Sequence, residues 1–247
     1  LDNIFPIFGY DRFVDVFGGA GWVTVKSKRA ARCERHYNDF NPHLANIYNW
    51  FRNDPEQVLQ FLTTWPQQDP VLYRQYQQDI FAKHEPATTA ETAAKYLYLE
   101  IQSFSGNTLG LNSSVYFDKI HKLDSIIRKL QNPKIVQSLK TIAGVHNKSF
   151  DQLIPELDSP STYFYCDPPY YGLEHYYTQK FSVEQHETLA QTLKACQGGW
   201  AVSYYEFDRL ESWYPRNQYS WHTYSVSKQS SSRRNKQRGQ EVVITNA

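Results

Sequence analysis

The stretch Thr162-Tyr163-Phe164-Tyr165-Cys166-Asp167-Pro168-Pro169-Tyr170 decides how the rest of the chain is interpreted. Its first five residues form a short, largely apolar run, which is typical of a strand buried on both faces. The acidic and proline residues of Asp167-Pro168-Pro169-Tyr170 follow directly after this predicted strand. Because open α/β sheets bind their ligands beyond the carboxyl ends of the strands, the sequence predicts a ligand site at residues 167–170.

Residues 167–170 also carry chemistry that suits a weakly nucleophilic amine. The exocyclic amine of adenine has its lone pair delocalised into the ring, and acceptors for both amine protons push its nitrogen toward tetrahedral geometry. Asp167 offers a carboxylate and Pro168 a carbonyl, and the consecutive prolines Pro168 and Pro169 hold both acceptors because they restrict the backbone. Tyr170 offers an aromatic face on which a flipped-out base can stack. A proline-rich turn without a ligand is the alternative interpretation.

A glycine-rich turn follows the first predicted strand. The β-prone run Arg12–Phe17 breaks at Gly18-Gly19-Ala20-Gly21, and glycines after a strand let the backbone approach a ligand closely. The full G-x-G-x-x-G pattern is missing, because Thr24 occupies the last glycine position counted from Gly19. Taken alone, this stretch is also explained by a plain glycine turn.

An acidic residue ends the second predicted strand, Cys33–Tyr37. Asp39 lies about 20 residues after the glycine turn, where an acidic side chain can accept hydrogen bonds from ribose hydroxyls. An ordinary turn residue is the alternative. Asn41-Pro42 then predicts the start of a helix that runs to about Arg52.

The middle of the chain, residues 53–144, is rich in Gln, Lys and Leu at helical spacing. Thr88-Thr89-Ala90-Glu91 predicts a capping box and a helix through about Ser103. Phe104-Ser105-Gly106-Asn107 is a break, and Asp118–Leu130 is predicted to be helical. We therefore expect a mainly helical insertion.

Alternating elements return after this insertion. A helix is predicted over Val183–Ala195, with Ser182 as N-cap and Gln185 as its capping-box partner. Trp200–Glu206 and Glu241–Asn246 are two further predicted strands, joined by the polar, basic stretch Ser227–Gln240. Strands that alternate with helices predict an α/β fold with a mostly parallel sheet.

Composition limits the class of protein. Hydrophobic residues make up 40% and charged residues 21% of the 247 residues, so a substantial core can form. No apolar run of about 18 residues occurs, so we expect no membrane span. Three cysteines without a C-x-x-C pair favour reduced thiols in a cytoplasmic protein without a zinc site. A net charge of +1 does not exclude nucleic acid, because a binder needs only a local basic face.

A glycine loop, an acid after the second strand and a D-P-P-Y turn, in this order, resemble the DNA adenine-N6 methyltransferases of the Dam-like (D12) family, α group. The resemblance covers nearly the whole chain, and residues 171–186 are similar to a phage-associated branch. The stretches that carry it are Phe17-x-Gly19-x-Gly21, Tyr37-Asn38-Asp39, Phe104-Ser105-Gly106, Asp167-Pro168-Pro169-Tyr170 and Glu241-Val242-Val243-Ile244-Thr245-Asn246.

The resemblance implies a Rossmann-like S-adenosylmethionine-dependent methyltransferase core, residues 1–52 and 145–247, with a helical target recognition domain, residues 53–144, inserted. It implies that Asp167, Pro168, Pro169 and Tyr170 are catalytic. S-adenosyl-L-methionine would be bound by Asp15, Phe17, Gly19, Gly21, Asp39, Phe40, Phe150 and Asp167. Many relatives carry Asp-Phe where this chain has Ser149-Phe150, so the implied contact depends on Phe150.

Double-stranded DNA is the implied partner of a monomeric protein. The implied DNA contacts are Phe104, Ser105, Gly106, Asn107, Lys228, Arg233 and Arg234. The basic residues among them can track phosphates and make binding salt-dependent, or belong to a surface loop without a ligand. Further cations on the predicted helices are either solvated or contact phosphate: Arg74, Lys83, Lys95, Lys119, Lys122, Arg128 and Lys129.

The implied reaction is direct in-line methyl transfer to a flipped-out adenine, without a covalent enzyme intermediate or a metal. His186, early in a predicted helix, is interpreted as structural. Two alternatives stay open: the same chemistry on cytosine N4 or on adenine in RNA, and a non-catalytic DNA-binding remnant. The remnant is suggested because family members carry a G-G-K-type segment upstream of the first strand, before the point where this chain begins. The chain starts with Leu and contains no Met, so we expect the translated protein to be longer.

Overall fold

The computed structural model describes residues 9–103, 122–172, 181–227 and 238–246. Contacts divide these residues into two compact units. Unit 1 holds the described residues of Leu1–Asn38, Lys148–His175 and Gln179–Ala247, and unit 2 holds those of Asp39–Asn147. The helix that follows the second strand therefore groups with the helical middle of the chain, whereas the sequence places it with the core.

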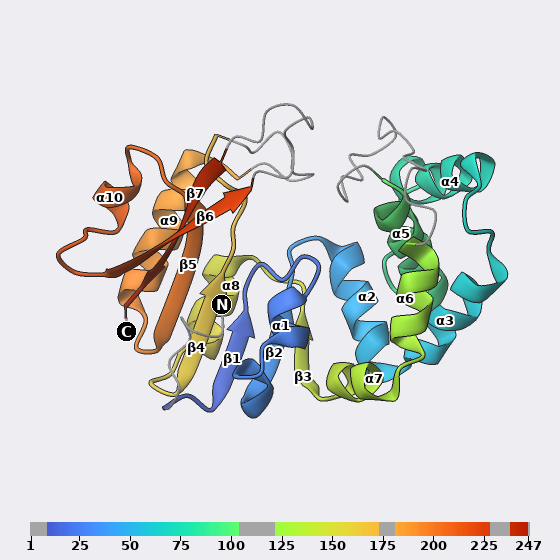
Figure 1. The fold of residues 1–247 in the computed structure, drawn as a ribbon, viewed down its shortest axis with the longest axis horizontal. Helices are drawn as coiled ribbons and strands as arrows, with labels where there is room; N and C mark the ends of the chain where they lie inside the picture. The colour runs from blue at the N-terminus through green and yellow to red at the C-terminus, as the bar shows by residue number, and fades with distance from the viewer. Residues whose placement is uncertain (1–8, 104–121, 173–180, 228–237, 247) are drawn as a thin grey trace. The chain divides into compact units, whose positions relative to one another are not determined.

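A seven-stranded sheet is formed within the described residues (Figure 1), in the order β3-β2-β1-β4-β5-β7-β6. Pairing is parallel between β1 and β2, β1 and β4, and β4 and β5, and antiparallel where β7 pairs with β5 and β6. This confirms the predicted α/β class with a mostly parallel sheet. The strands are β1 (Arg12–Asp15), β2 (Glu34–Asn38), β3 (Ile142–His146), β4 (Thr162–Cys166), β5 (Gly199–Tyr205), β6 (Ser220–Ser227) and β7 (Arg238–Thr245).

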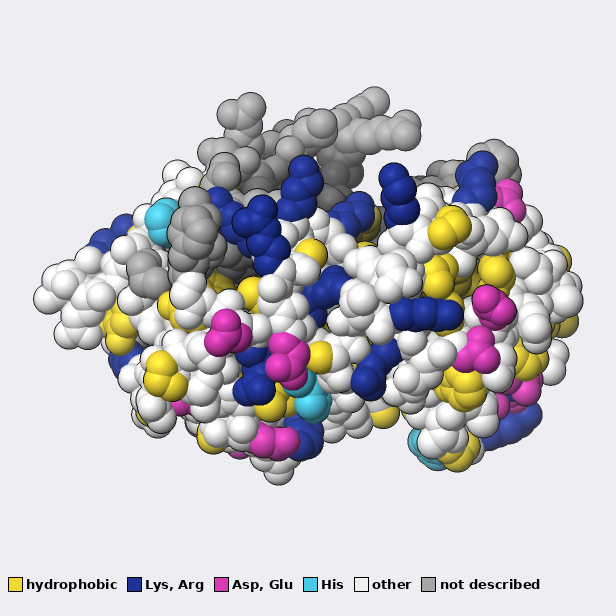
Figure 2. Space-filling model, turned by 90° about the horizontal axis from the view of Figure 1, so that it is seen from below, with side chains coloured by type: hydrophobic (Ala, Val, Ile, Leu, Met, Phe, Trp, Pro, Cys, Tyr) yellow, Lys and Arg dark blue, Asp and Glu magenta, His cyan; other side chains and the backbone are white. Residues whose placement is uncertain are grey.

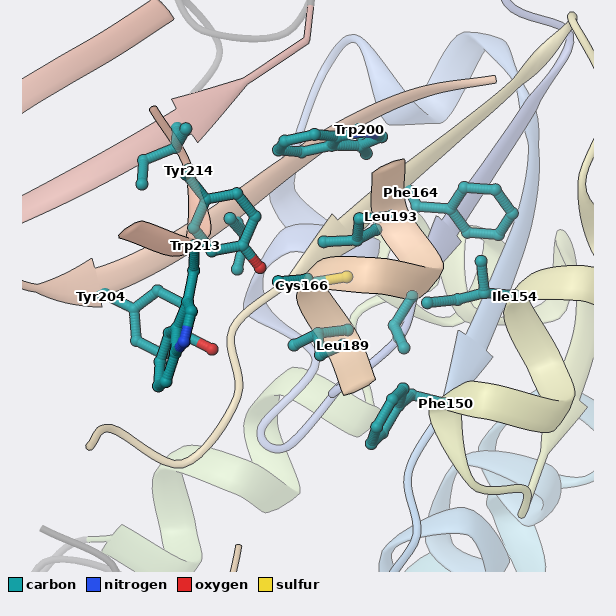
Figure 3. Packing of buried hydrophobic residues seen from close by; sticks show 14 of the residues in the cluster. Phe150, Ile154, Phe164, Cys166, Leu189, Leu193, Trp200, Tyr204, Trp213 and Tyr214 are labelled. Carbon is teal, nitrogen blue, oxygen red and sulfur yellow. The ribbon is translucent and has the colours of Figure 1, made fainter. Parts of the chain in front are cut away.

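The strand β4 is buried on both faces, as its sequence predicts. All five of its residues are buried. Phe164 and Cys166 pack with the helices α8 (Phe150–Leu157), α9 (Val183–Ala195) and α10 (Leu210–Trp213). Figure 3 shows Leu189 and Leu193 of α9 beside Cys166 in this cluster.

The opposite face of β4 has a smaller apolar cluster. Tyr163 and Tyr165 pack there with Val23 and Ala30. These partners come from α1 (Trp22–Lys26) and from the 3₁₀ turn η1 (Ala30–Arg32). The core of unit 1 therefore lies on both sides of the sheet, as expected for parallel strands.

Unit 2 is mainly helical, and its helices begin where the sequence chemistry favours them. Pro occupies the first position of four helices, where its missing N–H costs no hydrogen bond. Asn41, Asp69 and Asn132 accept backbone hydrogen bonds as N-caps of three of them. The elements are α2 (Pro42–Asn53), α3 (Pro55–Thr64), α4 (Pro70–Gln77), the π-helical turn η2 (Gln78–Ala82), α5 (Ala90–Gln102), α6 (Lys122–Leu130) and α7 (Pro133–Lys140).

Several boundaries depart from the sequence prediction. The capping box of α5 is formed by Thr89 and Thr92, one residue later than predicted, and Glu91 forms an ion pair with Lys95. The strand β3 was missed because Gly144 interrupts its short apolar run. The strand β6 was missed because its residues are mostly polar. The helix α9 begins and ends where predicted, with the capping box of Ser182 and Gln185 in place.

Every helix in the described part of the chain is too short or too polar to cross a membrane.

Replacing Leu189 by Ala should lower the free energy of unfolding by about 2–5 kcal/mol, because the fully buried side chain would leave a cavity between α9 and β4. Urea denaturation followed by circular dichroism measures this change. Glu187→Ala, two residues away on the exposed side of α9, is the control and should change stability by less than about 0.5 kcal/mol. Equal stability of the two variants would contradict the packing described for α9.

Candidate active site

The predicted ligand residues of unit 1 meet where the strand order reverses. The chain continues from β1 to β2 on one side, whereas β4 and β5 lie on the other side of β1. Asp15 pairs with Tyr165 across β1 and β4, and the Val16 N–H donates to the Tyr165 carbonyl at 2.9 Å. Asp167 follows two residues after Tyr165. Open α/β sheets bind ligands at such a switch point, outside the carboxyl ends of the strands.

Asp15 fixes the element that follows the glycine loop. It is buried, and its Oδ2 accepts hydrogen bonds from Thr24 Oγ1 at 2.6 Å and from the Thr24 N–H at 3.3 Å. Because Thr24 belongs to α1, the carboxylate joins the end of β1 to this helix. A contact between Asp15 and a cofactor stays a prediction.

The glycine loop needs glycine for two different reasons. A Cβ at Gly18 would lie 2.2 Å from the ring of Tyr37, so only glycine fits beside that ring. Gly19 and Gly21 have φ angles of 48° and 62°, which favour glycine. The Tyr37 hydroxyl donates to the Gly19 carbonyl at 2.8 Å. A Cβ at Gly19 would meet no atom within 4 Å, so the backbone there faces open space.

Asn38 is a site residue to which sequence reasoning gave no role. Its buried Nδ2 donates to the carbonyls of Val16 at 2.8 Å and Lys148 at 3.1 Å. Its Oδ1 accepts from the Lys148 N–H at 3.0 Å. One side chain therefore joins the end of β2 to Val16, directly after β1, and to the segment that leads into α8.

Two aromatic residues predicted for the cofactor lie together in unit 1. The ring centroids of Phe17 and Phe150 are 5.9 Å apart. Phe181, which sequence reasoning did not select, packs against both rings at 5.7 and 5.5 Å. The three rings form an apolar wall next to the glycine loop.

Asp39 and Phe40 belong to unit 2 and directly follow β2 in the chain. The Asp39 Oδ1 accepts from the Asn41 N–H at 2.8 Å. Asn147 Nδ2 donates to the carbonyls of Asp39 and Phe40 at 2.8 and 2.9 Å. The backbone is therefore fixed, while the Phe40 side chain is 58% exposed.

Asp167 reaches the surface, although dense protein surrounds its carboxyl group. Its Oδ1 accepts a hydrogen bond from Ser203 Oγ of β5 at 2.6 Å. Burial raises the pKa of Asp167 to about 6, and hydrogen bonds from Ser203 and Tyr170 oppose this rise. The carboxyl group is therefore mostly ionised at neutral pH and can accept a hydrogen bond.

Tyr170 is held from two sides. Its hydroxyl donates to Glu241 Oε1 of β7 at 3.0 Å. Its ring packs edge-on against Tyr205 of β5, with centroids 4.6 Å apart. Pro168 is buried and Pro169 half-buried between Asp167 and Tyr170. The four residues thus form one fixed group, two of whose partners come from β5 and one from β7.

The implied DNA contacts fall in another part of the chain. Phe104, Ser105, Gly106, Asn107, Lys228, Arg233 and Arg234 lie outside the described residues. Among the helical candidates, Arg74, Lys83, Arg128 and Lys129 are exposed. Lys95 is buried and forms ion pairs with Asp79, Glu85 and Glu91, so its ammonium group is not presented to solvent.

The comparisons with known proteins agree with this geometry. The family model of D12 class N6 adenine-specific DNA methyltransferases matches residues 1–230. The chain belongs to this family. It is also similar to the type II methyltransferase M1.LlaDCHI of Lactococcus lactis subsp. cremoris, with 26% identity over 194 residues. This match covers 72% of the chain and 62% of the relative, so the chain spans less than two thirds of the length of that curated protein.

His186 is a buried core residue of this D12-class chain. Its Nδ1 and the Tyr204 hydroxyl oxygen lie 2.9 Å apart, and its ring stacks on Trp213. Tyr204 in turn lies beside Tyr170, with ring centroids 6.4 Å apart. This environment agrees with the structural interpretation of His186. Within the described residues, no cluster of His, Cys, Asp and Glu is arranged to hold a metal ion.

Asp167→Asn should raise the melting temperature of this D12-class protein at about pH 8. The folded pKa of about 6 exceeds the ordinary value of 3.8, so folding disfavours the ionised carboxyl group. The contribution of protonated Asp167 to stability is complete below the pKa that it has in the unfolded chain, and it is lost as the pH rises through the pKa that it has in the folded protein. Differential scanning fluorimetry should show an advantage of the variant that is nearly constant above about pH 7 and shrinks between about pH 6 and pH 4. A variant less stable than wild type at pH 8 would show that the charged form stabilises the fold.

Proposed function

We propose that this protein transfers a methyl group from S-adenosyl-L-methionine to the N6 amine of adenine at specific sites in double-stranded DNA. Membership of the D12 family supports the reaction class. The observation that carries the proposal is the position of Asp167, beside the end of β1 and its glycine loop, at the switch point of the sheet. The similar protein from Lactococcus lactis is named a type II methyltransferase, which supports a role in restriction–modification.

The residues of unit 1 fit S-adenosyl-L-methionine. The open space over Gly19 lets a ligand approach the backbone, and Phe17 and Phe150 offer an apolar wall. When bound, this cofactor supplies a methyl group on a positively charged sulfur. The nearby carboxylates of Asp15 and Asp167 suit that charge. Asp39 directly follows β2 in the chain, and its role as an acceptor for ribose hydroxyls stays a prediction.

Asp167 and Pro168 prepare the amine in the proposed reaction. The ionised carboxylate accepts a hydrogen bond from one amine proton, and the carbonyl of Pro168 accepts one from the other. Both acceptors favour the tetrahedral nitrogen that develops during transfer, and they are oriented before the substrate arrives. The amine loses its proton only after alkylation, so Asp167 acts chiefly as an acceptor and electrostatic stabiliser.

Tyr170 gives the proposed site its aromatic contact with the base. An adenine in a duplex must leave the stack before its N6 can react, and the flipped base is stabilised by stacking on an aromatic side chain. Because Glu241 and Tyr205 hold the Tyr170 ring, this surface is formed before DNA binds. A preformed contact surface lowers the conformational-entropy cost of binding DNA.

DNA contacts are proposed for the helical part of the chain and for the basic residues after β6. Figure 2 shows several groups of Lys and Arg side chains, although the net charge is only +1. Exposed cations of unit 2 such as Arg74, Arg128 and Lys129 are suited to phosphates. Binding through phosphate contacts weakens steeply as the salt concentration rises.

Transfer of label from S-adenosyl-L-methionine to unmethylated genomic DNA, followed by nucleoside analysis, tests the proposal. We expect label in N6-methyladenine. Label in N4-methylcytosine, or transfer to RNA alone, would contradict the proposed substrate. If the protein neither transfers label nor binds the cofactor in calorimetry, a non-catalytic DNA binder is favoured.

Asp167→Ala should reduce turnover by at least about 10²-fold, because the amine loses its hydrogen-bond acceptor and the positive charge that develops on its nitrogen loses the stabilising carboxylate. Binding of S-adenosyl-L-methionine, measured by isothermal titration, should stay close to that of the wild type. Glu187→Ala, an exposed substitution on α9, is the matched control and should retain full turnover. Turnover like that of the wild type in Asp167→Ala would contradict the assignment of Asp167.

A further inference from the structure

Two polar side chains from neighbouring strands support the D-P-P-Y residues, and neither was predicted from the sequence to be a site residue. Ser203 lies in β5, whose other residues up to Tyr204 are buried and mostly apolar. Glu241 lies in β7 and pairs with Tyr205 of β5. Ser203 interrupts an otherwise apolar stretch of β5, and Glu241 lies half-buried where β7 changes from polar to apolar residues. Both positions call for an explanation beyond packing.

Ser203 contacts the carboxyl group directly. It is fully buried, and its Oγ donates to Asp167 Oδ1 at 2.6 Å. The register explains this contact, because Val202 pairs with Cys166 and Ser203 therefore lies next to Asp167. The hydroxyls of Tyr165 and Tyr170 also interact with Ser203. A buried serine with this set of partners fixes the orientation of the carboxyl group.

Glu241 contacts the other end of the motif. Its Oε1 accepts from the Tyr170 hydroxyl at 3.0 Å, while the Tyr170 ring packs edge-on against Tyr205 at 4.6 Å. The hydrogen bond fixes the position of the hydroxyl end of the ring, and the edge-on contact with Tyr205 limits rotation of the ring. Strand β7 thus determines where the aromatic face lies.

We propose that Ser203 and Glu241 are positioning residues of the D-P-P-Y group, with Ser203 orienting the Asp167 carboxylate and Glu241 orienting the Tyr170 ring. This proposal rests on the proposed function for its catalytic consequence. Its structural part, the coupling of these two residues to Asp167, holds whatever the substrate is. The two parts can therefore be tested separately.

The two residues act on the acidity of Asp167 in opposite directions. The hydrogen bond from Ser203 favours the ionised carboxylate and lowers its pKa, whereas the negative charge of Glu241 disfavours it and raises its pKa. The Asp15 carboxyl group lies at the end of the neighbouring strand β1 and interacts with Tyr165 and Cys166. The neutral titratable groups around Asp167 are the hydroxyls of Tyr165, Tyr170, Tyr204 and Tyr205 and the thiol of Cys166. Burial raises the pKa of each of them, so they stay neutral while Asp167 titrates.

Direct titration of the Asp167 carboxyl carbon by NMR, in protein labelled with ¹³C-aspartate and assigned with Asp167→Asn, tests the structural part without cofactor or DNA. Relative to the wild type, Ser203→Ala should move the midpoint to higher pH, and Glu241→Gln should move it to lower pH. Glu187→Gln removes an equal charge on the exposed side of α9 and should leave the midpoint unchanged. Midpoints that do not move, or that move in the same direction, would overturn the proposal.

The catalytic part is tested by the pH dependence of kcat/KM for methyl transfer. The acidic limb should shift upward in Ser203→Ala and downward in Glu241→Gln, which a purely structural defect would not produce. Glu241→Gln keeps an acceptor for the Tyr170 hydroxyl, whereas Glu241→Ala and Tyr170→Phe each lose the hydrogen bond. These last two should lower kcat/KM by about tenfold or more, because a misplaced stacking surface is costly.

The outcomes distinguish the two proposals. Opposite NMR shifts without methyl transfer by the wild-type protein would retain the coupling of Ser203 and Glu241 to Asp167 and overturn the proposed function. Methyl transfer to adenine with equal kcat/KM for Glu241→Gln, Glu241→Ala and wild type would retain the function and overturn the role of Glu241. Thermal melting of each variant separates loss of folding from loss of positioning.

Discussion

The burial of β4 on both faces is the constraint on which the rest of the structure depends. A strand whose residues Thr162–Cys166 are all buried must lie in the middle of the sheet, with apolar layers on either side. Its first polar side chain that reaches solvent is therefore Asp167, at the carboxyl end. Because β4 lies next to β1, this end also adjoins the glycine loop, so one packing requirement brings together the two motifs that carry the chemistry.

The polar residues of unit 1 show how this arrangement is held. Asn38 satisfies carbonyls from two separate segments, Asp15 holds Thr24, and Ser203 holds Asp167. Each is a buried polar side chain with its hydrogen-bond partners inside the protein, as buried polar groups require. Asp15 and Asn38 are the last residues of their strands, where the ladder stops and backbone groups need other partners, whereas Ser203 lies within β5 beside the end of β4. Local departures from an apolar pattern are thus concentrated around the candidate site.

The sequence predicts what depends on neighbouring residues and misses what depends on register. The capping box of Ser182 and Gln185 defines α9 because its signals lie within four residues of each other. The strand β6 is hidden by its polar residues, and it is recognisable only once β7 pairs with it. Ser203 and Asp167 are 36 residues apart, and Asn38 and Lys148 are 110 apart. Such contacts depend on the strand order, and composition and periodicity do not predict the strand order.

The environment of Asp167 balances two requirements that oppose each other. Burial among aromatic rings favours the neutral acid, yet acceptance of amine protons requires the carboxylate. The hydrogen bonds from Ser203 and Tyr170 offset part of the burial, so the pKa rises only to about 6 and the ionised form dominates at neutral pH. Glu241 shifts this balance the other way while it holds Tyr170. The same side chains that fix the geometry of the site therefore also set the pH above which its carboxylate can act.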